Sequence, residues 1–346
     1  MDTFSGYQVG VNLGGWISQY PRYDLAHFES FIGEADIRQI ASWGMDHVRL
    51  PVDYPVLEDD ERPFEYKPSG LAYIDNCLAW CQAAGLNLIL DLHRAPGYSF
   101  GSLAENSLFA SSQMQERFLR LWESLAERYR GQAPSGLVFE LLNEVVLPTS
   151  EPWNRLAHKA FERIRAADPL RWVMIGGNHY NSAWTLKEIE LVDDPRVVYT
   201  FHFYEPMPFT HQRAGWMENM TLLNGVVDYP GMVPGLGPFM EQHPQFRDEL
   251  GKYLTTPMDI AILRSNLQPA LDFQNKTGLP LYCGEFGAID HAPLQSRLNW
   301  HREFIGLLRE NKIGRAVWSY KEMNFRLVDQ NGKVASQELV KIVSQP

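Results

Sequence analysis

The sequence contains little cysteine, with Cys77, Cys81 and Cys283 as the only three in 346 residues. So small and odd a number implies no disulfide framework. Cys77 and Cys81 lie four residues apart on a predicted helix, and a buried free thiol packs as a small apolar side chain. A zinc site would need further ligands at suitable spacing, and none lie near in the sequence. We therefore expect three buried free thiols and no metal site.

Positive charge is also scarce, because 31 Lys and Arg stand against 42 Asp and Glu, a formal net charge of -11. Nucleic-acid binding depends on clustered basic side chains, so no nucleic-acid partner is predicted. No apolar run reaches the length of a membrane span, and no membrane partner is expected. The first residues, MDTFSGYQVGVNLGGW, lack the basic and apolar parts of a signal peptide. We expect a cytoplasmic protein, or a secreted one if a leader has been removed, and the sequence leaves the oligomeric state open.

Short apolar segments alternate with longer amphipathic segments along the whole chain. The short segments predict strands at Val9–Trp16, His47–Val52, Leu86–His93, Leu137–Asn143, Trp172–Gly176, Val197–Tyr204, Leu281–Phe286 and Ala316–Tyr320. The longer ones predict helices at Glu34–Trp43, Leu71–Ala84, Gln113–Arg130, Trp153–Ala167, Ala183–Leu191, Met258–Lys276, Leu294–Asn311 and Gln337–Val343. Several short segments, such as LNLILDL and GLVFELL, are apolar at nearly every position. This pattern is typical of strands in a parallel sheet that helices cover.

Eight successive strand–helix units predict an α/β protein with a single (β/α)8 TIM barrel domain over residues 1–346. An open doubly wound sheet is the alternative, but no Gly-rich phosphate loop follows the first strand and no G-x-S-x-G motif is present. One connection, residues 205–257 after the sixth strand, is unusually long and contains seven prolines. Because connections of this length are usually functional, we expect this insertion to form a wall or lid over the active-site face.

Active sites of such barrels lie at the carboxyl ends of the strands, so the polar residues at these ends are the site candidates. They are Arg49 and Asp53, Asp91 and His93, Asn143 and Glu144, His202 and Tyr204, Glu285, and the aromatic Trp318. Two carboxylates, Glu144 and Glu285, on different strand ends of an aromatic pocket suit glycoside hydrolysis. One acid would protonate the leaving oxygen while the other attacks the anomeric carbon or activates water. An aromatic face such as that of Trp318 suits stacking on a sugar ring.

Strand geometry sharpens this interpretation. His202 and Tyr204 share one strand face, because side chains two residues apart point the same way. Adjacent Asn143 and Glu144 can both face the cleft only if the strand ends or bulges there. Asp91 is interpreted as a buried partner for an arginine or for backbone amides.

Six short blocks occur in one order along the chain: HVRLP, LDLHRAPG, LLNE, HFYEP, GEFG and WSYKE. Together they resemble the blocks of glycoside hydrolase family 5, the cellulase family of (β/α)8 retaining glycosidases, from Val9 to Glu322. GVNLGGW and DLHRAPG also resemble the branch of exo-β-1,3-glucanases and β-glucosidases. The resemblance implies a retaining hydrolase that cleaves β-linked glucans or gluco-oligosaccharides by double displacement. No cofactor is expected.

The resemblance also implies roles for individual residues. Glu144 matches the general acid/base and Glu285 the nucleophile. Arg49 matches the arginine that orients the nucleophile, and its charge would favour the ionised carboxylate. The other positions that match substrate-binding groups are His93, Asn143, His202, Tyr204 and Trp318. Val145 stands where many family members have proline, so the leaving-group side of the cleft is expected to differ.

The sequence leaves the substrate linkage open between β-1,4-glucan and either β-1,3-glucan or short β-glucosides. A β-mannanase or β-mannosidase is a further alternative, since the family includes mannanases. Two alternatives come from other classes. A non-catalytic carbohydrate-binding barrel would be expected to lack Glu144 or Glu285, and both are present. A metal-dependent hydrolase would be excluded by activity that survives EDTA.

Overall fold

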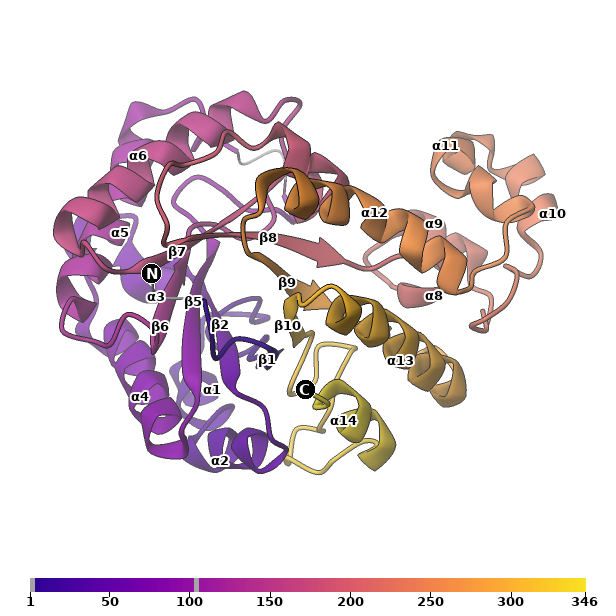
Figure 1. Ribbon diagram of the computed structural model, residues 1–346, viewed down its shortest axis with the longest axis horizontal. Helices are drawn as coiled ribbons and strands as arrows, with labels where there is room; N and C mark the ends of the chain where they lie inside the picture. Colours follow the sequence, from indigo (N-terminus) through magenta and orange to yellow (C-terminus); the bar gives the residue numbers. More distant parts are fainter. Residues whose placement is uncertain (1–3, 103–105) are drawn as a thin grey trace.

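The computed structural model of the protein describes residues 4–102 and 106–346. Eight parallel strands close into a barrel in the order β1-β10-β9-β8-β7-β6-β5-β2 (Figure 1). They are β1 Val9–Asn12, β2 His47–Asp53, β5 Asn87–Arg94, β6 Leu137–Glu140, β7 Trp172–Gly176, β8 Val197–Phe203, β9 Leu281–Phe286 and β10 Gly314–Val317. All eight predicted strands and the predicted (β/α)8 barrel are thus confirmed.

Seven of the predicted helices are present, and they surround the barrel in Figure 1. They are α2 Glu34–Ser42, α4 Pro68–Ala84, α5 Ser112–Tyr129, α6 Glu151–Ala167, α12 Ile260–Thr277, α13 Leu294–Glu310 and α14 Gln337–Val343. The helix predicted over residues 183–191 is wrong in type, because the chain forms only a short 3-10 helix, η2 Ala183–Glu188. Extended backbone at Ser182 and Ile189 bounds this segment and leaves no room for a longer helix.

Burial of both strand faces explains why the apolar segments form the barrel. Every residue of β2, β8 and β9 is buried, as expected when side chains fill the barrel interior and helices cover its outside. Local signals set the helix ends. Asp259 accepts hydrogen bonds from two backbone N–H groups at the start of α12, and Gly278, with φ of 68°, ends that helix. Cys77, Cys81 and Cys283 are free and buried, as predicted.

Several small elements were not predicted. They are α1 Leu25–Ser30, α3 Tyr54–Leu57, α7 Asn178–Asn181 and a hairpin of β3 Glu58–Asp59 with β4 Arg62–Tyr66. The hairpin lies outside the barrel sheet, and most of β4 is exposed or half-buried. An exposed strand of five residues has no buried apolar run, which is the pattern that identified the barrel strands.

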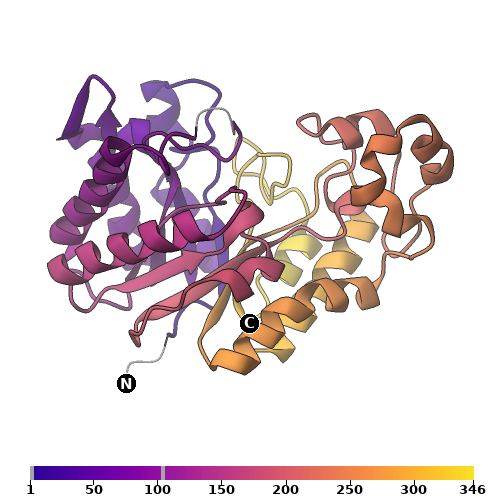
Figure 2. The ribbon, with the colours of Figure 1, turned by 90° about the horizontal axis from the view of Figure 1, so that it is seen from above.

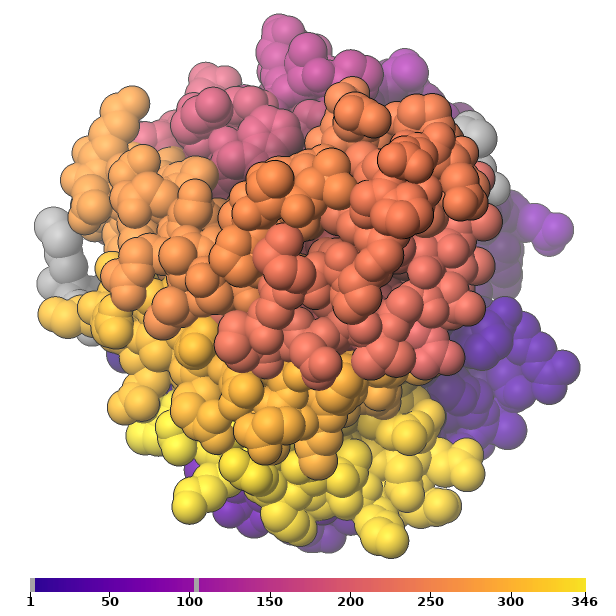
Figure 3. Space-filling view, turned by 90° about the vertical axis from the view of Figure 1, so that its right-hand side faces the viewer, coloured from indigo at the N-terminus to yellow at the C-terminus, as the bar shows by residue number. Residues whose placement is uncertain are grey.

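The insertion at residues 205–257 forms a cluster of short helices. These are α8 Met207–Thr210, α9 Glu218–Leu223, α10 Leu236–Gln242, η3 Pro244–Phe246, α11 Arg247–Leu250 and η4 Gly251–Leu254. In Figure 2 the cluster lies at the upper right, on the side of the barrel away from the N-terminus, and in Figure 3 it covers the middle of the face shown.

Four hydrogen bonds tie the insertion to α13, and the three shortest are as follows. Trp300 Nε1 donates to the carbonyl oxygen of Glu205 at 3.0 Å, and Ser296 Oγ donates to Asp228 Oδ1 at 2.9 Å. The third runs from the Tyr229 hydroxyl to a carboxylate oxygen of α13 at 2.6 Å. The role of the insertion as a wall or lid stays a prediction.

Among the described residues, no helix combines the length and the apolar character needed to cross a membrane.

Candidate active site

The predicted site residues meet at the carboxyl end of the barrel strands. Arg49 lies on β2, Asp91 and His93 on β5, His202 on β8 and Glu285 on β9. Tyr204 and Trp318 directly follow β8 and β10, while Asn143 and Glu144 lie three and four residues beyond the end of β6. Hydrogen bonds and ion pairs join most of them into one network of buried polar groups. The expectation that separate strands contribute one site is therefore confirmed in its geometry.

The chain leaves its strand just before Asn143 and Glu144, which explains how two adjacent side chains reach one site. β6 ends at Glu140, three residues earlier than predicted. Asn143 Oδ1 accepts a hydrogen bond from Arg49 Nη2 at 2.9 Å. Glu144 Oε1 lies 2.9 Å from Nδ1 of His202. Both side chains therefore turn into the barrel mouth.

Arg49 is fully buried, and each of its five N–H groups has a partner. Nε donates to Glu140 Oε2 at 2.7 Å, and Nη2 donates to Glu140 Oε1 at 3.1 Å. Nη1 donates to Asn12 Oδ1 at 2.9 Å and to Glu285 Oε1 at 2.8 Å. The remaining Nη2 hydrogen goes to Asn143. A guanidinium has five donors in one plane, so these contacts fix its orientation completely.

Asp91 and His93 form a buried pair beside Arg49. Asp91 Oδ2 lies 2.7 Å from His93 Nδ1 and 3.0 Å from Arg49 Nη2. This confirms the prediction that Asp91 partners an arginine. Burial raises the pKa of Asp91 to about 7 and lowers the pKa of His93 to about 4. The imidazole is therefore neutral at neutral pH, and its Nε2 is a buried atom with no hydrogen-bond partner among the described residues.

Glu285 receives a hydrogen bond on each carboxylate oxygen. Arg49 Nη1 donates to Oε1 at 2.8 Å, and the Tyr204 hydroxyl donates to Oε2 at 2.9 Å. Burial raises the pKa of Glu285, while Arg49, His93 and the Tyr204 hydrogen bond lower it. The expectation that Arg49 lies beside Glu285 is confirmed. The charge of Arg49 opposes the effect of burial on the pKa of Glu285 without fully cancelling it.

Glu144 lacks a cationic partner of this kind. Its neighbour His202 is kept neutral, because burial moves the pKa of that imidazole well below its usual value. Burial, followed by the charge of Glu285, raises the pKa of Glu144 well above its usual value. The two carboxyl groups therefore differ in environment: Glu285 has two donors aimed at it, and Glu144 has a neutral imidazole.

Glu144, His202 and Glu285 each offer one ligand atom within 4.8 Å of the others. Such a group could hold a metal ion, although the sequence predicts no metal. Retaining glycosidases use two carboxyl groups about 5–5.5 Å apart, and the close approach of Glu144 and Glu285 suits such a pair. We assign no metal to these groups, and the EDTA experiment below tests that choice.

Trp318 forms one wall of the site. Its ring lies parallel to that of His93, with centroids 5.8 Å apart and an interplanar angle of 6°. Gly14, in the loop after β1, makes room for it, because a Cβ atom there would lie 2.6 Å from Cη2 of Trp318. The insertion reaches the site through His211, whose ring centroid lies 5.1 Å from that of Tyr204.

Sequence reasoning missed Asn12 and Glu140, two partners of Arg49. Both carried a signal, since each is a polar residue inside an otherwise apolar predicted strand: VGVN for Asn12 and LVFE for Glu140. Asp53, considered as a strand-end candidate, instead accepts a hydrogen bond from the backbone N–H of Gln19 at 3.1 Å.

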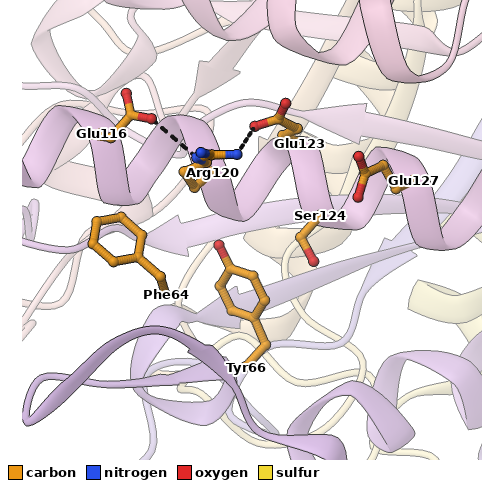
Figure 4. A pocket seen from close by; sticks show the side chains of 7 residues that line it. All are labelled: Phe64, Tyr66, Glu116, Arg120, Glu123, Ser124 and Glu127. Carbon is orange, nitrogen blue, oxygen red and sulfur yellow. Dashed lines mark hydrogen bonds and ion pairs between the residues drawn. The ribbon is translucent and has the colours of Figure 1, made fainter.

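A separate groove of about 400 Å³ lies between β4 and α5, outside the barrel sheet. Its lining residues are Phe64, Tyr66, Glu116, Arg120, Glu123, Ser124 and Glu127 (Figure 4). Arg120 pairs with Glu116 at 3.2 Å and with Glu123 at 3.1 Å. The groove brings together no pair of unpaired carboxylates and no buried histidine, so we place the active site at the barrel mouth.

Known proteins show the same architecture and related sequences. The family model "Cellulase (glycosyl hydrolase family 5)" matches residues 8–324. Endoglucanase C of Acetivibrio thermocellus is 46% identical over 341 residues, which cover 98% of each chain. Cellodextrinase A of Ruminococcus flavefaciens is 35% identical over 90% of this chain and 84% of its own. The crystal structure of endoglucanase Cel5A from Thermotoga maritima superposes with a TM-score of 0.79 at 22% identity, covering 99% of this chain and 100% of that one. The chain therefore belongs to glycosyl hydrolase family 5, the cellulase family.

Proposed function

We propose that this O-glycosyl hydrolase cleaves β-1,4-linked glucans and cello-oligosaccharides with retention of anomeric configuration. One observation carries the proposal: Glu144 and Glu285 bring carboxylate oxygens within 4.8 Å of each other at the barrel mouth, in two different environments. Retaining hydrolysis needs one carboxylate that attacks and one carboxylic acid that donates a proton, lying close to each other.

Glu285 is the nucleophile in this proposal. Arg49 and Tyr204 hold its two oxygens and favour its ionised form. A carboxylate oxygen attacks the anomeric carbon, and the bond from that carbon to the leaving oxygen breaks. The product of this step is a glycosyl ester of Glu285.

Glu144 is the acid/base. Its raised pKa favours the protonated form, and this proton passes to the leaving oxygen in the first step. In the second step the Glu144 carboxylate takes a proton from water. The hydroxide oxygen then attacks the anomeric carbon and releases Glu285. Two inversions at one carbon give net retention.

The atoms left unpaired at the mouth suit a sugar ring. His93 Nε2 and Asn143 Nδ2 are buried and have no hydrogen-bond partner among the described residues. Because Asn143 Oδ1 is occupied by Arg49, its Nδ2 is free to donate to a sugar hydroxyl. Trp318 supplies an apolar face against which a pyranose ring can stack. We propose these three residues as binding groups for the sugar next to the scissile bond.

The family and its relatives support the β-1,4 linkage. Two relatives that cover most of this chain bear the names endoglucanase and cellodextrinase, and the matching family model is described as cellulase. β-1,3-Glucan, the other linkage that the sequence leaves open, and β-mannan stay alternatives that the substrate panel below decides. The partner expected from this proposal is a soluble glucan or oligosaccharide.

The test compares hydrolysis of aryl β-glucoside, β-cellobioside, β-laminaribioside and β-mannobioside by the wild type, Glu144→Ala and Glu285→Ala. We expect the cellobioside to be the best substrate and both variants to lose nearly all activity. Azide should rescue Glu285→Ala with an α-glycosyl azide product and Glu144→Ala with a β-glycosyl azide. A wild type that cleaves none of these substrates, or a Glu285→Ala variant of unchanged rate, would overturn the proposal.

The same assay in excess EDTA tests the metal-dependent alternative. We expect no change in rate, since the two carboxyl groups and water suffice for the chemistry. Loss of activity in EDTA that added Zn²⁺ or Mn²⁺ restores would assign Glu144, His202 and Glu285 to a metal instead.

A further inference from the structure

Glu140 is a fully buried carboxylate in the middle of the barrel. It is the last residue of β6, with 0% exposure, and it lies four positions before Glu144 in the sequence. Its two oxygens accept from Nε and Nη2 of Arg49 at 2.7 and 3.1 Å, a bidentate pair of parallel hydrogen bonds. Such a pair fixes the plane of the guanidinium as well as its position.

The orientation of that plane determines which residues the remaining N–H groups of Arg49 reach. Once Nε and one Nη2 hydrogen are held by Glu140, Nη1 points at Glu285 and the second Nη2 hydrogen points at Asn143. The hydrogen bond to Asn143 sets which side of its amide faces inward, and so leaves Nδ2 for the substrate. Two groups that the proposed mechanism uses are thus aligned through one arginine.

Charge gives a second consequence. Arg49 carries one positive charge and faces three carboxylates, those of Asp91, Glu140 and Glu285. Glu140 makes the closest and only bidentate contact of the three, so it neutralises most of the charge of Arg49. Arg49 therefore lowers the pKa of Glu285 less than an arginine without a second carboxylate partner would.

We propose that Glu140 is a positioning residue for glycoside hydrolysis: it clamps Arg49 so that the guanidinium holds Glu285 in line and orients the amide of Asn143. This inference rests on the proposed function, because Glu140 acts only through groups of that mechanism. Glu140 itself contacts no substrate, since both of its oxygens are occupied by Arg49.

The titration of Glu285 depends on several groups besides Glu140. Arg49 on β2 is the charged group that contacts Glu285 directly. The other charged and titratable groups around these two residues are Asp91 and His93 on β5, Glu140 on β6, Glu144 after β6, His202 on β8, Tyr204 after β8, and Tyr282 on β9. A change at Glu140 removes none of these other groups from the chain, although it loosens the clamp on Arg49. The comparison with Glu140→Asp, which keeps the charge and loses the fit, therefore assigns a shift in the pH profile to the lost charge.

Two substitutions separate the geometric effect from the charge effect. Glu140→Gln keeps the size of the side chain but removes the charge and turns one acceptor into a donor facing Arg49. Glu140→Asp keeps the charge but shortens the side chain by one methylene and breaks the bidentate fit. Both should lower kcat on an aryl β-cellobioside by about 10²-fold, the scale of a 1 Å misplacement, with a much smaller change in KM.

The pH profile distinguishes the two variants. The acidic limb of kcat/KM reports ionisation of Glu285 in the free enzyme. Glu140→Gln should move this limb to lower pH, because the uncompensated Arg49 stabilises the ionised carboxylate. Glu140→Asp should leave the limb where the wild type has it. A purely structural role would lower the activity of both variants without moving the limb in either.

The chain offers a matched control in Glu58, another buried carboxylate that accepts from a buried arginine. Arg117 Nε lies 3.2 Å and Nη2 3.1 Å from Glu58 Oε2, outside the barrel mouth. Glu58→Gln should lower the thermal unfolding temperature and keep kcat and the pH profile of the wild type.

The outcomes separate failure of this inference from failure of the proposed function. If the wild type and Glu58→Gln cleave the cellobioside while Glu140→Gln keeps both the wild-type kcat and its acidic limb, Glu140 has no positioning role. If the wild type cleaves no glycoside, the proposed function itself fails. Should Glu140→Gln not fold, Glu140→Asp carries the test, and a wild-type kcat in that folded variant overturns the inference.

Discussion

The hydroxyl of Tyr204 donates to Oε2 of Glu285 at 2.9 Å, on the carboxylate oxygen opposite the one held by Arg49. The attacking group of the proposed mechanism is therefore held from two strands at once. A hydrogen bond to an ionised carboxylate lowers its pKa, and a tyrosine that donates in this way resists ionisation itself. Burial and the charge of Glu285 raise the pKa of Tyr204 well above its usual value.

Tyr204→Phe should lower kcat/KM at neutral pH by about tenfold or more, given the ~1.5–3 kcal/mol of a hydrogen bond to a charged group. Loss of the donor raises the pKa of Glu285, so the acidic limb of the pH profile should move to higher pH. This is opposite to the shift expected for Glu140→Gln. A pH profile of kcat/KM on an aryl β-cellobioside measures both, and an unmoved limb in Tyr204→Phe would contradict the assigned contact.

Glu144→Gln should lose about 10²–10⁴-fold in kcat on cello-oligosaccharides, the usual contribution of a general acid. The loss should be small for the first step of a 2,4-dinitrophenyl β-cellobioside, whose leaving group departs without protonation. The basic limb of the wild-type profile, which reports deprotonation of Glu144, should disappear. A burst of dinitrophenol measured by stopped flow would show the trapped glycosyl-enzyme. Equal losses on both substrates would argue against an acid role.

Asp91 gives a prediction about stability rather than rate. Its pKa in the folded protein is about 7, above the 3.8 of the unfolded chain, so the folded state holds the proton more tightly. Its contribution to stability is therefore present below pH 4 and is lost as the pH rises through 7. Asp91→Asn, which cannot ionise, should destabilise the protein less at pH 8 than at pH 5. Thermal unfolding at the two pH values measures this difference, and the reverse order would mean that Asp91 is ionised in the fold.

Gly14→Ala should disturb Trp318, because the added Cβ would lie 2.6 Å from its ring. We expect KM for cellotetraose to rise several-fold and the unfolding temperature to fall, since Trp318 is only 5% exposed and its ring has little room to move. Gly131→Ala is the matched control, because a Cβ there meets no atom within 4 Å. If the two variants bind cellotetraose equally well, Trp318 is not part of the sugar site.

The sequence predicts the barrel well because its strands are buried on both faces. Segments such as β2 and β9 are apolar apart from a few polar residues, so the sequence alone identifies them as buried strands. The carboxyl-end rule then places Arg49, Glu144 and Glu285 near one another. The sequence does not predict the end of β6, because the apolar segment LVFELL continues for two residues after the strand ends at Glu140. That ending is what lets Asn143 and Glu144 face the same way.

The sequence did not predict which residues from distant segments contact each other. Glu140 and Asn12 were passed over because their importance lies in sharing Arg49, and 37 residues separate Asn12 from Arg49 along the chain. The insertion was predicted only as a long connection, because its helices, of 3 to 7 residues each, are too short to show a helical pattern in the sequence. The β3–β4 hairpin escaped prediction because its second strand is largely exposed.

The burial of all three thiols has a practical consequence for following the insertion in solution. A hydrogen bond with Cys81, followed by burial, raises the pKa of Cys77 well above its usual value, and burial does the same for Cys283. Each of the three cysteines is buried and therefore shielded from reagents. A cysteine introduced at Trp216, a 57% exposed position of the insertion, would be the one thiol that a maleimide reaches readily. A fluorescent or spin label placed there would report on the insertion while substrate binds, with no need to remove the native cysteines first.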